Sequence, residues 1–294
     1  MQKTWTWTTT GYSFVGKSLD EISQTCQHAG LAGVEAALEV FPSETDAQLE
    51  SVAARFAAAG LGFDSFHLPF AADDDICSFY ETTRKKAVEK AQRSMERAAI
   101  LGARAGIQHP TTNRFDAEAE GLDRYLKQLD KSLQVLLPAA EKLNFTLVLE
   151  NMLPGDQGGR LCSRPEHFER IATEFGHSNL GFCLDTGHAL VAGGGHEGAL
   201  AFVEAMAPHL VAFHLADNAG DRDSHLAPGH GRVDFGPAFR LAAGKGYPFS
   251  MCIETPPFAQ GPAYSLDAWK QMVEDTQALA DTALADAAPA EGSS

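Results

Sequence analysis

The sequence predicts a single (β/α)8 barrel. Apolar runs typical of strands alternate eight times with amphipathic stretches typical of helices along the 294 residues. The strand runs are continuously apolar, which favours parallel strands covered on both faces. No break in composition suggests a domain boundary, and one such barrel takes about 250 residues. We expect residues 1–284 to form the barrel and residues 285–294 to form a disordered C-terminal tail.

Helix start and stop signals divide the chain into eight strand–helix units. Ser18 and Glu21 form a capping box with Gly30 as the stop, and a second box begins at Ser163. We expect strands at residues 5–8, 33–39, 62–67, 105–109, 145–150, 181–185, 210–214 and 250–254. The helices are predicted at residues 18–28, 46–59, 78–101, 118–143, from 163 onward, 197–206, 237–243 and 265–284.

The chain is strongly acidic, with a formal net charge of −16. Such a chain repels nucleic acid and anionic membranes unless a local basic patch overrides the overall field. The densest basic cluster lies between Arg84 and Arg93, among glutamates in a helical pattern typical of a solvated helix face. We therefore expect neither a nucleic-acid partner nor a membrane partner.

The cysteines and the N-terminus favour a cytoplasmic location. Five cysteines without CxxC spacing predict no disulfide framework, and Cys183 and Cys252 lie in apolar strands, where a reduced cysteine packs as a small hydrophobe. The first residues lack the apolar segment of a signal peptide. No apolar run approaches the ~18 residues that cross a bilayer.

Six of the predicted strands end on a side chain that can bind a metal or move a proton. These residues are His67, His109, Glu150, Asp185, His214 and Glu254. In a (β/α)8 barrel the C-terminal ends of the strands meet at one mouth, which carries catalysis. Three carboxylates and three imidazoles crowded together need a counter-charge, and a divalent metal ion supplies it.

Several of these residues also have an ordinary structural explanation. Asp185 can be the N-cap of a following helix, and His67 or His109 alone would suit a hydrogen-bonded histidine of the core or rim. Glu35, in the middle of a strand, is expected to be a buried carboxylate that ties strands together. For Glu39, at the end of the second predicted strand, two roles stay open, that of a lid residue and that of a substrate contact.

A metal site explains four of the strand ends best. Glu150 and Glu254 each follow a run of apolar residues, so their carboxylates lose hydration and something must compensate. A cation held by Glu150, Asp185, His214 and Glu254 provides the compensation. Mixed carboxylate and imidazole ligands suit Mn²⁺, Zn²⁺, Co²⁺ or Fe²⁺, and the lack of thiolates excludes a structural zinc site of the cysteine type. We expect Mn²⁺, with Zn²⁺, Co²⁺ or Mg²⁺ as alternatives.

Short motifs at the strand ends resemble the xylose-isomerase-like TIM-barrel superfamily. The motifs are Leu149–Asn151, Leu184–His188, Phe213–Asp217, Pro228–Gly231 with Asp234–Phe235, and Ile253–Thr255. The superfamily contains isomerases and epimerases of sugars and sugar phosphates, and also endonuclease IV. The resemblance spans about residues 4–284 and implies the same barrel.

Within that superfamily, the tagatose-3-epimerase-like enzymes imply roles for individual residues. Their metal ligands fall on Glu150, Asp185, His214 and Glu254, and their catalytic acid/base pair falls on the two glutamates. The implied reaction is metal-dependent isomerisation or epimerisation of a sugar, sugar phosphate or keto-sugar by α-proton abstraction through a metal-stabilised enediolate. Residues expected to contact the substrate are His188, His67, His109, His225 and Asp223. The arginine that those epimerases place shortly after the metal-binding histidine is absent here.

Two other reactions compete with this interpretation. A lyase or dehydratase acting on a keto-sugar or inosose would begin with the same proton abstraction. Endonuclease IV uses three zinc ions held by nine ligands, and counterparts of all nine are present: His67, His109, Glu150, Asp185, His188, His214, Asp223, His225 and Glu254. The charge of −16 argues against the nuclease. We expect a small-molecule sugar as the partner, and by analogy with the superfamily a homo-oligomer is an alternative to a monomer.

Overall fold

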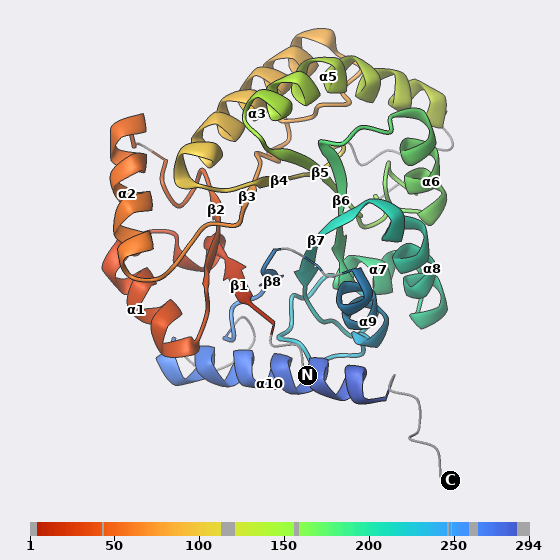
Figure 1. Ribbon diagram of the computed structural model, residues 1–294. Helices are drawn as coiled ribbons and strands as arrows, with labels where there is room; N and C mark the ends of the chain where they lie inside the picture. The colour runs from red at the N-terminus through yellow and green to blue at the C-terminus, as the bar shows by residue number, and fades with distance from the viewer. Residues whose placement is uncertain are drawn as a thin grey trace.

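Eight parallel strands close into a barrel in chain order, which confirms the predicted (β/α)8 architecture (Figure 1). The computed structural model describes residues 5–42, 44–112, 121–155, 159–245, 247, 249–258 and 264–286. The strands are β1 (Trp7–Thr10), β2 (Gly33–Ala37), β3 (Ser65–His67), β4 (Ala105–Gln108), β5 (Thr146–Glu150), β6 (Leu180–Asp185), β7 (Leu210–Leu215) and β8 (Met251–Ile253). Pairing of β1 with both β2 and β8 closes the sheet.

A ring of helices surrounds the barrel (Figure 1). The described helices are α1 (Leu19–Ala29), α2 (Asp46–Ala58), α3 (Glu81–Leu101), α5 (Leu122–Lys142), α6 (Pro165–Glu174), α7 (Thr186–Ala192), α8 (His196–Met206), α9 (Gly236–Lys245) and α10 (Leu266–Ala285). The last helix packs beside the first, so the two ends of the barrel sequence meet. The capping box at Ser18 is present, and its hydroxyl accepts from the backbone N–H of Glu21.

The pleat of the strands decides which side chains enter the barrel. Ile107, Val148, Cys183 and Ala212 pack together in its interior, whereas residues such as Leu149 pack in the layer between sheet and helices. Side chains on a strand alternate between the two faces. The residues two positions further along β5, β6 and β7 therefore also point inward, and they are Glu150, Asp185 and His214.

Several predicted elements have other bounds in the structure, and one helix was not predicted. The third strand begins at Ser65 rather than at residue 62, and α3 begins at Glu81 rather than at residue 78. The predicted capping box at Ser163 is absent, because α6 begins after Arg164, whose side chain makes no capping hydrogen bond.

The first strand runs from Trp7 to Thr10 rather than over residues 5–8, because its pairing with β2 begins at Thr8. Residues 186–192 form α7, which was not among the predicted helices. It begins directly after Asp185, whose side chain accepts from the His188 N–H, so Asp185 is an N-cap as considered above. The predicted start of a helix at 118 lies outside the described residues, as does the predicted tail from residue 287 onward.

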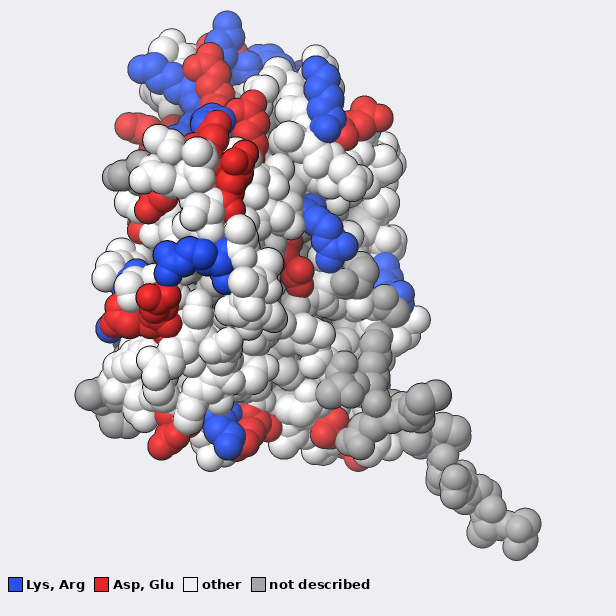
Figure 2. Space-filling view, turned by 60° about the vertical axis from the view of Figure 1, so that its left-hand side comes forward, with Lys and Arg blue, Asp and Glu red and all other residues white. Residues whose placement is uncertain are grey.

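The predicted basic helix face carries paired charges. Lys90 lies 2.7 Å from Asp74, and Arg93 lies 3.0 Å from Glu96. Arg84, however, is buried and donates to the Ser132 hydroxyl (2.9 Å). On the face shown in Figure 2, basic and acidic side chains stand side by side.

All five cysteines are free and buried, which includes the predicted burial of Cys183 and Cys252. In the part of the chain that the structure describes, no helix combines the length and the hydrophobicity needed to span a bilayer.

Candidate functional site

Four strand ends bring Glu150, Asp185, His214 and Glu254 together at the mouth of the barrel. Each offers one ligand atom, and these atoms all lie within 4.8 Å of one another. The register explains the convergence, because Asp185 pairs with His214 across β6 and β7, and His214 pairs with Cys252 across β7 and β8. The first three side chains are fully buried, and Glu254 is 9% exposed.

Three carboxylate oxygens in this group lack a hydrogen-bond partner among the described residues. They are Oε2 of Glu150, Oδ2 of Asp185 and Oε2 of Glu254. The His214 Nδ1 lies 3.1 Å from Glu254 Oε2 and 3.2 Å from Glu150 Oε1, so one ring nitrogen stands among several acceptors. Buried carboxylate oxygens without donors are costly unless a cation compensates them. The donor set, three carboxylates and one imidazole, fits a divalent metal ion.

Glu35 fixes the orientation of the His214 ring. The Glu35 carboxylate oxygens lie 3.1 and 3.2 Å from His214 Nε2, and the Ser65 hydroxyl donates to Glu35 at 2.7 Å. A carboxylate can only accept, so Nε2–H donates and Nδ1 is left to face Glu150 and Glu254. Metal-binding histidines almost always donate their second ring N–H in this way. The expected strand-tying carboxylate therefore contacts the predicted metal ligand itself.

The charges of this group are interdependent. Burial favours the neutral form of Glu150, but the charge of His214 and the nearby imidazole of His109 hold the pKa of Glu150 well below its usual range. The pKa of Asp185 is raised to about 8, because the side chain is buried and stands near Glu254 and Glu150. Although burial opposes its charged form, the carboxylates of Glu254, Glu35 and Glu150 raise the pKa of His214 well above its usual value. One imidazole therefore stands against three carboxyl groups, and the group has too little positive charge to balance them.

A second group of ligand atoms consists of His188, Asp223 and His225. The His188 Nδ1–H donates to the Asn151 carbonyl (2.8 Å), and the His225 Nδ1–H donates to the Glu254 carbonyl (2.7 Å). Both rings therefore turn Nε2 toward Asp223 Oδ2, at 3.3 and 2.9 Å.

The second group also shows strong mutual stabilisation of charge. Burial opposes charge on His188, yet the nearby Asp185 and the bond to Asp223 raise the pKa of His188 to about 10. Against the same effect of burial, the hydrogen bond to Asp223 raises the pKa of His225 to about 10. Without a metal ion, each imidazole is therefore protonated at the Nε2 atom that could otherwise bind the metal.

The two remaining histidines lie on the other side of Glu150. The His67 Nε2 is 3.8 Å and the His109 Nε2 is 3.2 Å from Glu150 Oε2, while the His67 Nδ1–H donates to the Leu68 carbonyl (3.0 Å). His67, Glu150 and His214 form a third set of ligand atoms within common reach. The mouth therefore gathers all nine candidate residues. Their individual roles stay predictions.

Aromatic side chains form one wall of the mouth. The ring of Phe70 is 38% exposed and lies 4.8 Å from His67 and 4.7 Å from His109, centroid to centroid. Tyr12 contacts both Phe70 and His67 edge-on. Nothing in the local sequence around Tyr12 marks it as a residue of the mouth. Trp269, in contrast, is fully buried and packs on Phe14.

Asp217 holds the loop that carries Asp223 and His225. Its buried carboxylate accepts from four backbone N–H groups, at 2.8–3.0 Å, those of Asn218, Gly229, Gly231 and Val233. A Cβ at Gly231 would lie 2.3 Å from the carboxylate, so only glycine fits there. The Pro228–Gly231 motif is thus explained by the loop's attachment to Asp217.

Comparisons with known proteins agree with this fold. The model of the family described as xylose isomerase-like TIM barrel matches residues 23–281. An uncharacterized protein of Sinorhizobium fredii is 25% identical over 230 residues, 72% of each chain. A probable endonuclease 4 of Mycobacterium leprae is 30% identical over 148 residues, which cover 49% of this chain and 54% of that protein.

Solved structures with the same fold include a D-tagatose 3-epimerase-like protein. It has a TM-score of 0.77 and 21% identity, and the match covers 97% of this chain and all of that one (100%). The 3-keto-D-glucoside 4-epimerase of E. coli has a TM-score of 0.76 and 18% identity, with coverage of 94% and 100%. With the family match extending over most of the sequence, this chain belongs to the xylose isomerase-like TIM barrel family.

Proposed function

We propose that this chain is a divalent-metal-dependent isomerase or epimerase that acts on a sugar, a sugar phosphate or a keto-sugar. The observation that carries the proposal is the buried group of Glu150, Asp185, His214 and Glu254, whose ligand atoms lie within 4.8 Å of one another and whose carboxylates include three oxygens without a hydrogen bond. Family membership and the epimerases among the structural neighbours support the same class of reaction.

The donors favour a metal ion that accepts oxygen and nitrogen ligands. Cys252 lies within reach of Glu35 and His214, but burial raises the pKa of its thiol well above the usual value, so it stays protonated. Without a thiolate, the ligands suit Mn²⁺, with Zn²⁺, Co²⁺ or Mg²⁺ as alternatives. A divalent ion bound there would polarise a substrate carbonyl and make the neighbouring C–H group more acidic.

Glu150 and Glu254 are the proposed proton carriers. They project from β5 and β8, with β6 and β7 between them, so they approach a substrate from different sides of the mouth. One carboxylate removes the proton from the carbon next to the carbonyl, and the other returns a proton. Return on the opposite face gives an epimer, and return at the neighbouring carbon gives an isomer.

The surrounding residues place the two carboxylates and the substrate. Asp185 is held as the cap of α7, and His214 is held by Glu35, so neither ligand can turn freely. Because Phe70 is half-exposed beside His67 and His109, it offers an apolar ring to one face of a sugar.

A substrate panel tests this proposal. The protein is loaded separately with Mn²⁺, Zn²⁺, Co²⁺ and Mg²⁺ and incubated with ketoses, ketose phosphates and 3-keto-glycosides, and the products are identified by NMR. We expect an epimer or isomer from one substrate class, formed only with metal. Equal turnover in chelator would contradict metal dependence, and inactivity on every carbonyl sugar would contradict the substrate class.

A second candidate, metal-dependent phosphodiester cleavage, is favoured by one observation. All nine residues that match the endonuclease IV ligands lie at the mouth, and the second group forms a set separate from the first. Metal analysis and an abasic-site DNA duplex distinguish the two candidates. About three zinc ions per chain with cleavage of the duplex would establish the nuclease, whereas one ion without cleavage supports the sugar enzyme.

A further inference from the structure

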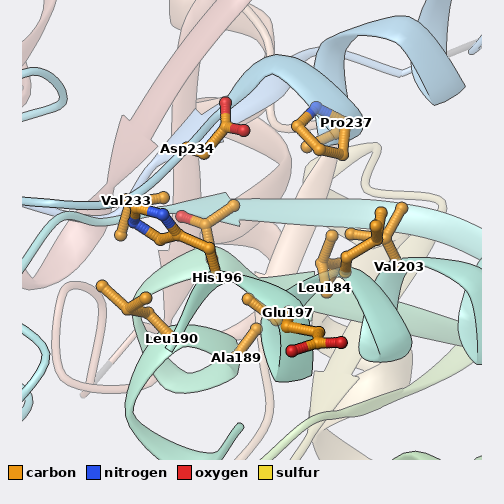
Figure 3. Close-up of a pocket in the computed structure, with 13 residues that line it drawn as sticks. Leu184, Ala189, Leu190, His196, Glu197, Val203, Val233, Asp234 and Pro237 are labelled. Atoms are coloured by element: carbon orange, nitrogen blue, oxygen red, sulfur yellow. The ribbon is translucent and has the colours of Figure 1, made fainter. Parts of the chain in front are cut away.

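A cavity of about 320 Å³ lies in the helix layer, outside the barrel (Figure 3). It is bounded by the end of β6, by α7 and α8, and by the segment that enters α9. In Figure 3, Asp234 and Pro237 stand on one side of it and Ala189 and Glu197 on the other. Protein interiors contain few voids larger than a water molecule. A cavity of this size is therefore a candidate site for a ligand.

Small side chains leave this space open. Ala189, Ala199 and Ala238 contribute to the walls from α7, α8 and α9 respectively. Gly193, the residue after α7, is already in close contact with Gly198 of α8, so the two helices cannot come closer together at this point. A Cβ on Gly193 would lie 2.4 Å from the Gly198 carbonyl carbon.

Most of the wall is apolar. Leu184 and Val203 lie on one side of the cavity and Leu190 and Val233 on the other, as Figure 3 shows. Leu200, at the edge, is 41% exposed, so the cavity opens to solvent. An apolar cavity of about 150 Å³ already accommodates benzene. The larger space here suits a two-ring or branched apolar body.

The polar groups in the wall offer acceptors. His196 Nε2–H donates to the Arg232 carbonyl (2.6 Å), which leaves Nδ1 as an acceptor in the neutral ring. The Asp234 carboxylate accepts the Gly236 N–H through Oδ1 (2.9 Å), and Glu197 brings a further carboxylate. Among the described residues that line the cavity there is no lysine or arginine.

We propose that this cavity binds a small organic cation, an amine with an apolar body. The alanine-lined interior accepts the body, and the carboxylates of Glu197 and Asp234 at the rim attract the ammonium group. The site is distinct from the metal centre, since Leu184 points to the helix layer while its neighbour Asp185 points into the barrel.

The cavity and the metal centre share one helix. Thr186, Ala189 and Leu190 turn one face of α7 toward the cavity, and His188 on the same helix reaches Asp223 on the other side. A ligand in the cavity would therefore contact the helix that carries His188. Binding itself does not depend on the function proposed for the barrel mouth.

Three indole compounds of similar shape test the proposal on the metal-loaded protein. Tryptamine carries an ammonium group, 3-ethylindole is its neutral counterpart, and indole-3-acetate is an anion. Binding is followed by saturation-transfer NMR and isothermal titration calorimetry. We expect tryptamine to bind about fivefold more tightly than 3-ethylindole, because two exposed carboxylates each contribute modestly, and indole-3-acetate to bind most weakly.

Amino-acid substitutions test whether tryptamine binds in this cavity. Ala199→Phe fills the cavity and should weaken tryptamine binding at least tenfold, whereas Glu204→Gln, an exposed change on the same helix outside the cavity, should bind as the unmodified chain does. Asp234→Asn should reduce the preference for tryptamine over 3-ethylindole without affecting 3-ethylindole, and it gives a test should Ala199→Phe misfold. Unchanged tryptamine binding in both Ala199→Phe and Asp234→Asn, or no binding of any indole, would overturn the proposal. Equal affinity for the amine and the neutral compound would overturn the assignment of a cation.

Discussion

Replacing Glu35 should weaken metal binding although Glu35 is not one of the four proposed ligands. Its carboxylate holds His214 through contacts of 3.1 and 3.2 Å to Nε2 and is itself held by Ser65 at 2.7 Å. Loss of such an outer partner costs about 10- to 100-fold in metal affinity, which is about 1.4–2.7 kcal/mol.

Two substitutions of Glu35 separate charge from orientation. Glu35→Gln keeps an acceptor for the His214 Nε2–H, so the loss should be near tenfold. Glu35→Ala leaves that N–H unpaired in a buried site, which costs about 1–3 kcal/mol, so the loss should approach 100-fold. Calorimetric titration with Mn²⁺ and the absorption bands of bound Co²⁺ measure affinity and ligand geometry.

A matched control and a folding check make the result interpretable. Glu204→Gln removes an exposed carboxylate from α8 and should bind metal as the unmodified chain does. Circular dichroism establishes that the Glu35 variants are folded. Metal affinity and Co²⁺ bands unchanged in folded Glu35→Ala would refute the conclusion that Glu35 positions His214.

Three further perturbations test neighbouring parts of the structure. Asp217→Ala removes the acceptor of four backbone N–H groups and should lower the free energy of unfolding by about 2–4 kcal/mol, measured by urea denaturation; an unchanged midpoint would contradict the role of this carboxylate. Chelation should lower the melting temperature, since metal at 100 times its Kd stabilises by about 2.7 kcal/mol; identical melting with and without chelator would contradict a bound ion. In metal-free protein at pH 8, the pKa values of His188 and His225, raised to about 10, keep both rings protonated. Metal bound at this second group would therefore release protons and bind more tightly as pH rises, which calorimetry in buffers of different ionisation enthalpy detects; binding without proton release would place the ion elsewhere.

The barrel was predictable because continuously apolar strand segments alternate with amphipathic helical segments along the chain. The residues at the mouth were predictable because each follows the end of an apolar strand segment, and the C-terminal ends of the strands meet at the mouth of a barrel. The first strand was placed two residues early, because Trp5 and Trp7 alternate equally well with the threonines around them. Only pairing with β2 and β8 selects the later register.

Other features depend on contacts between distant parts of the chain. Glu35 lies 179 residues from His214, so no local pattern could connect them. The short helix α7 has only seven residues and was not among the predicted helices, although Asp185 was considered as the N-cap of a following helix. One oxygen of Asp185 caps α7 and the other lacks a hydrogen-bond partner, so the cap is confirmed and the role as a metal ligand stays a prediction. The alanine-lined cavity follows from the packing of three helices and has no signature in the sequence.

The most direct test of the account is whether Glu150 and Glu254 move the proton. A keto-sugar turned over by the metal-loaded protein is incubated in D₂O, and deuterium at the carbon next to the carbonyl is measured by NMR. We predict incorporation by the unmodified chain and by Glu204→Gln, and its loss in both Glu150→Gln and Glu254→Gln. Continued incorporation in both of those variants, with metal still bound, would contradict a mechanism based on the two carboxylates.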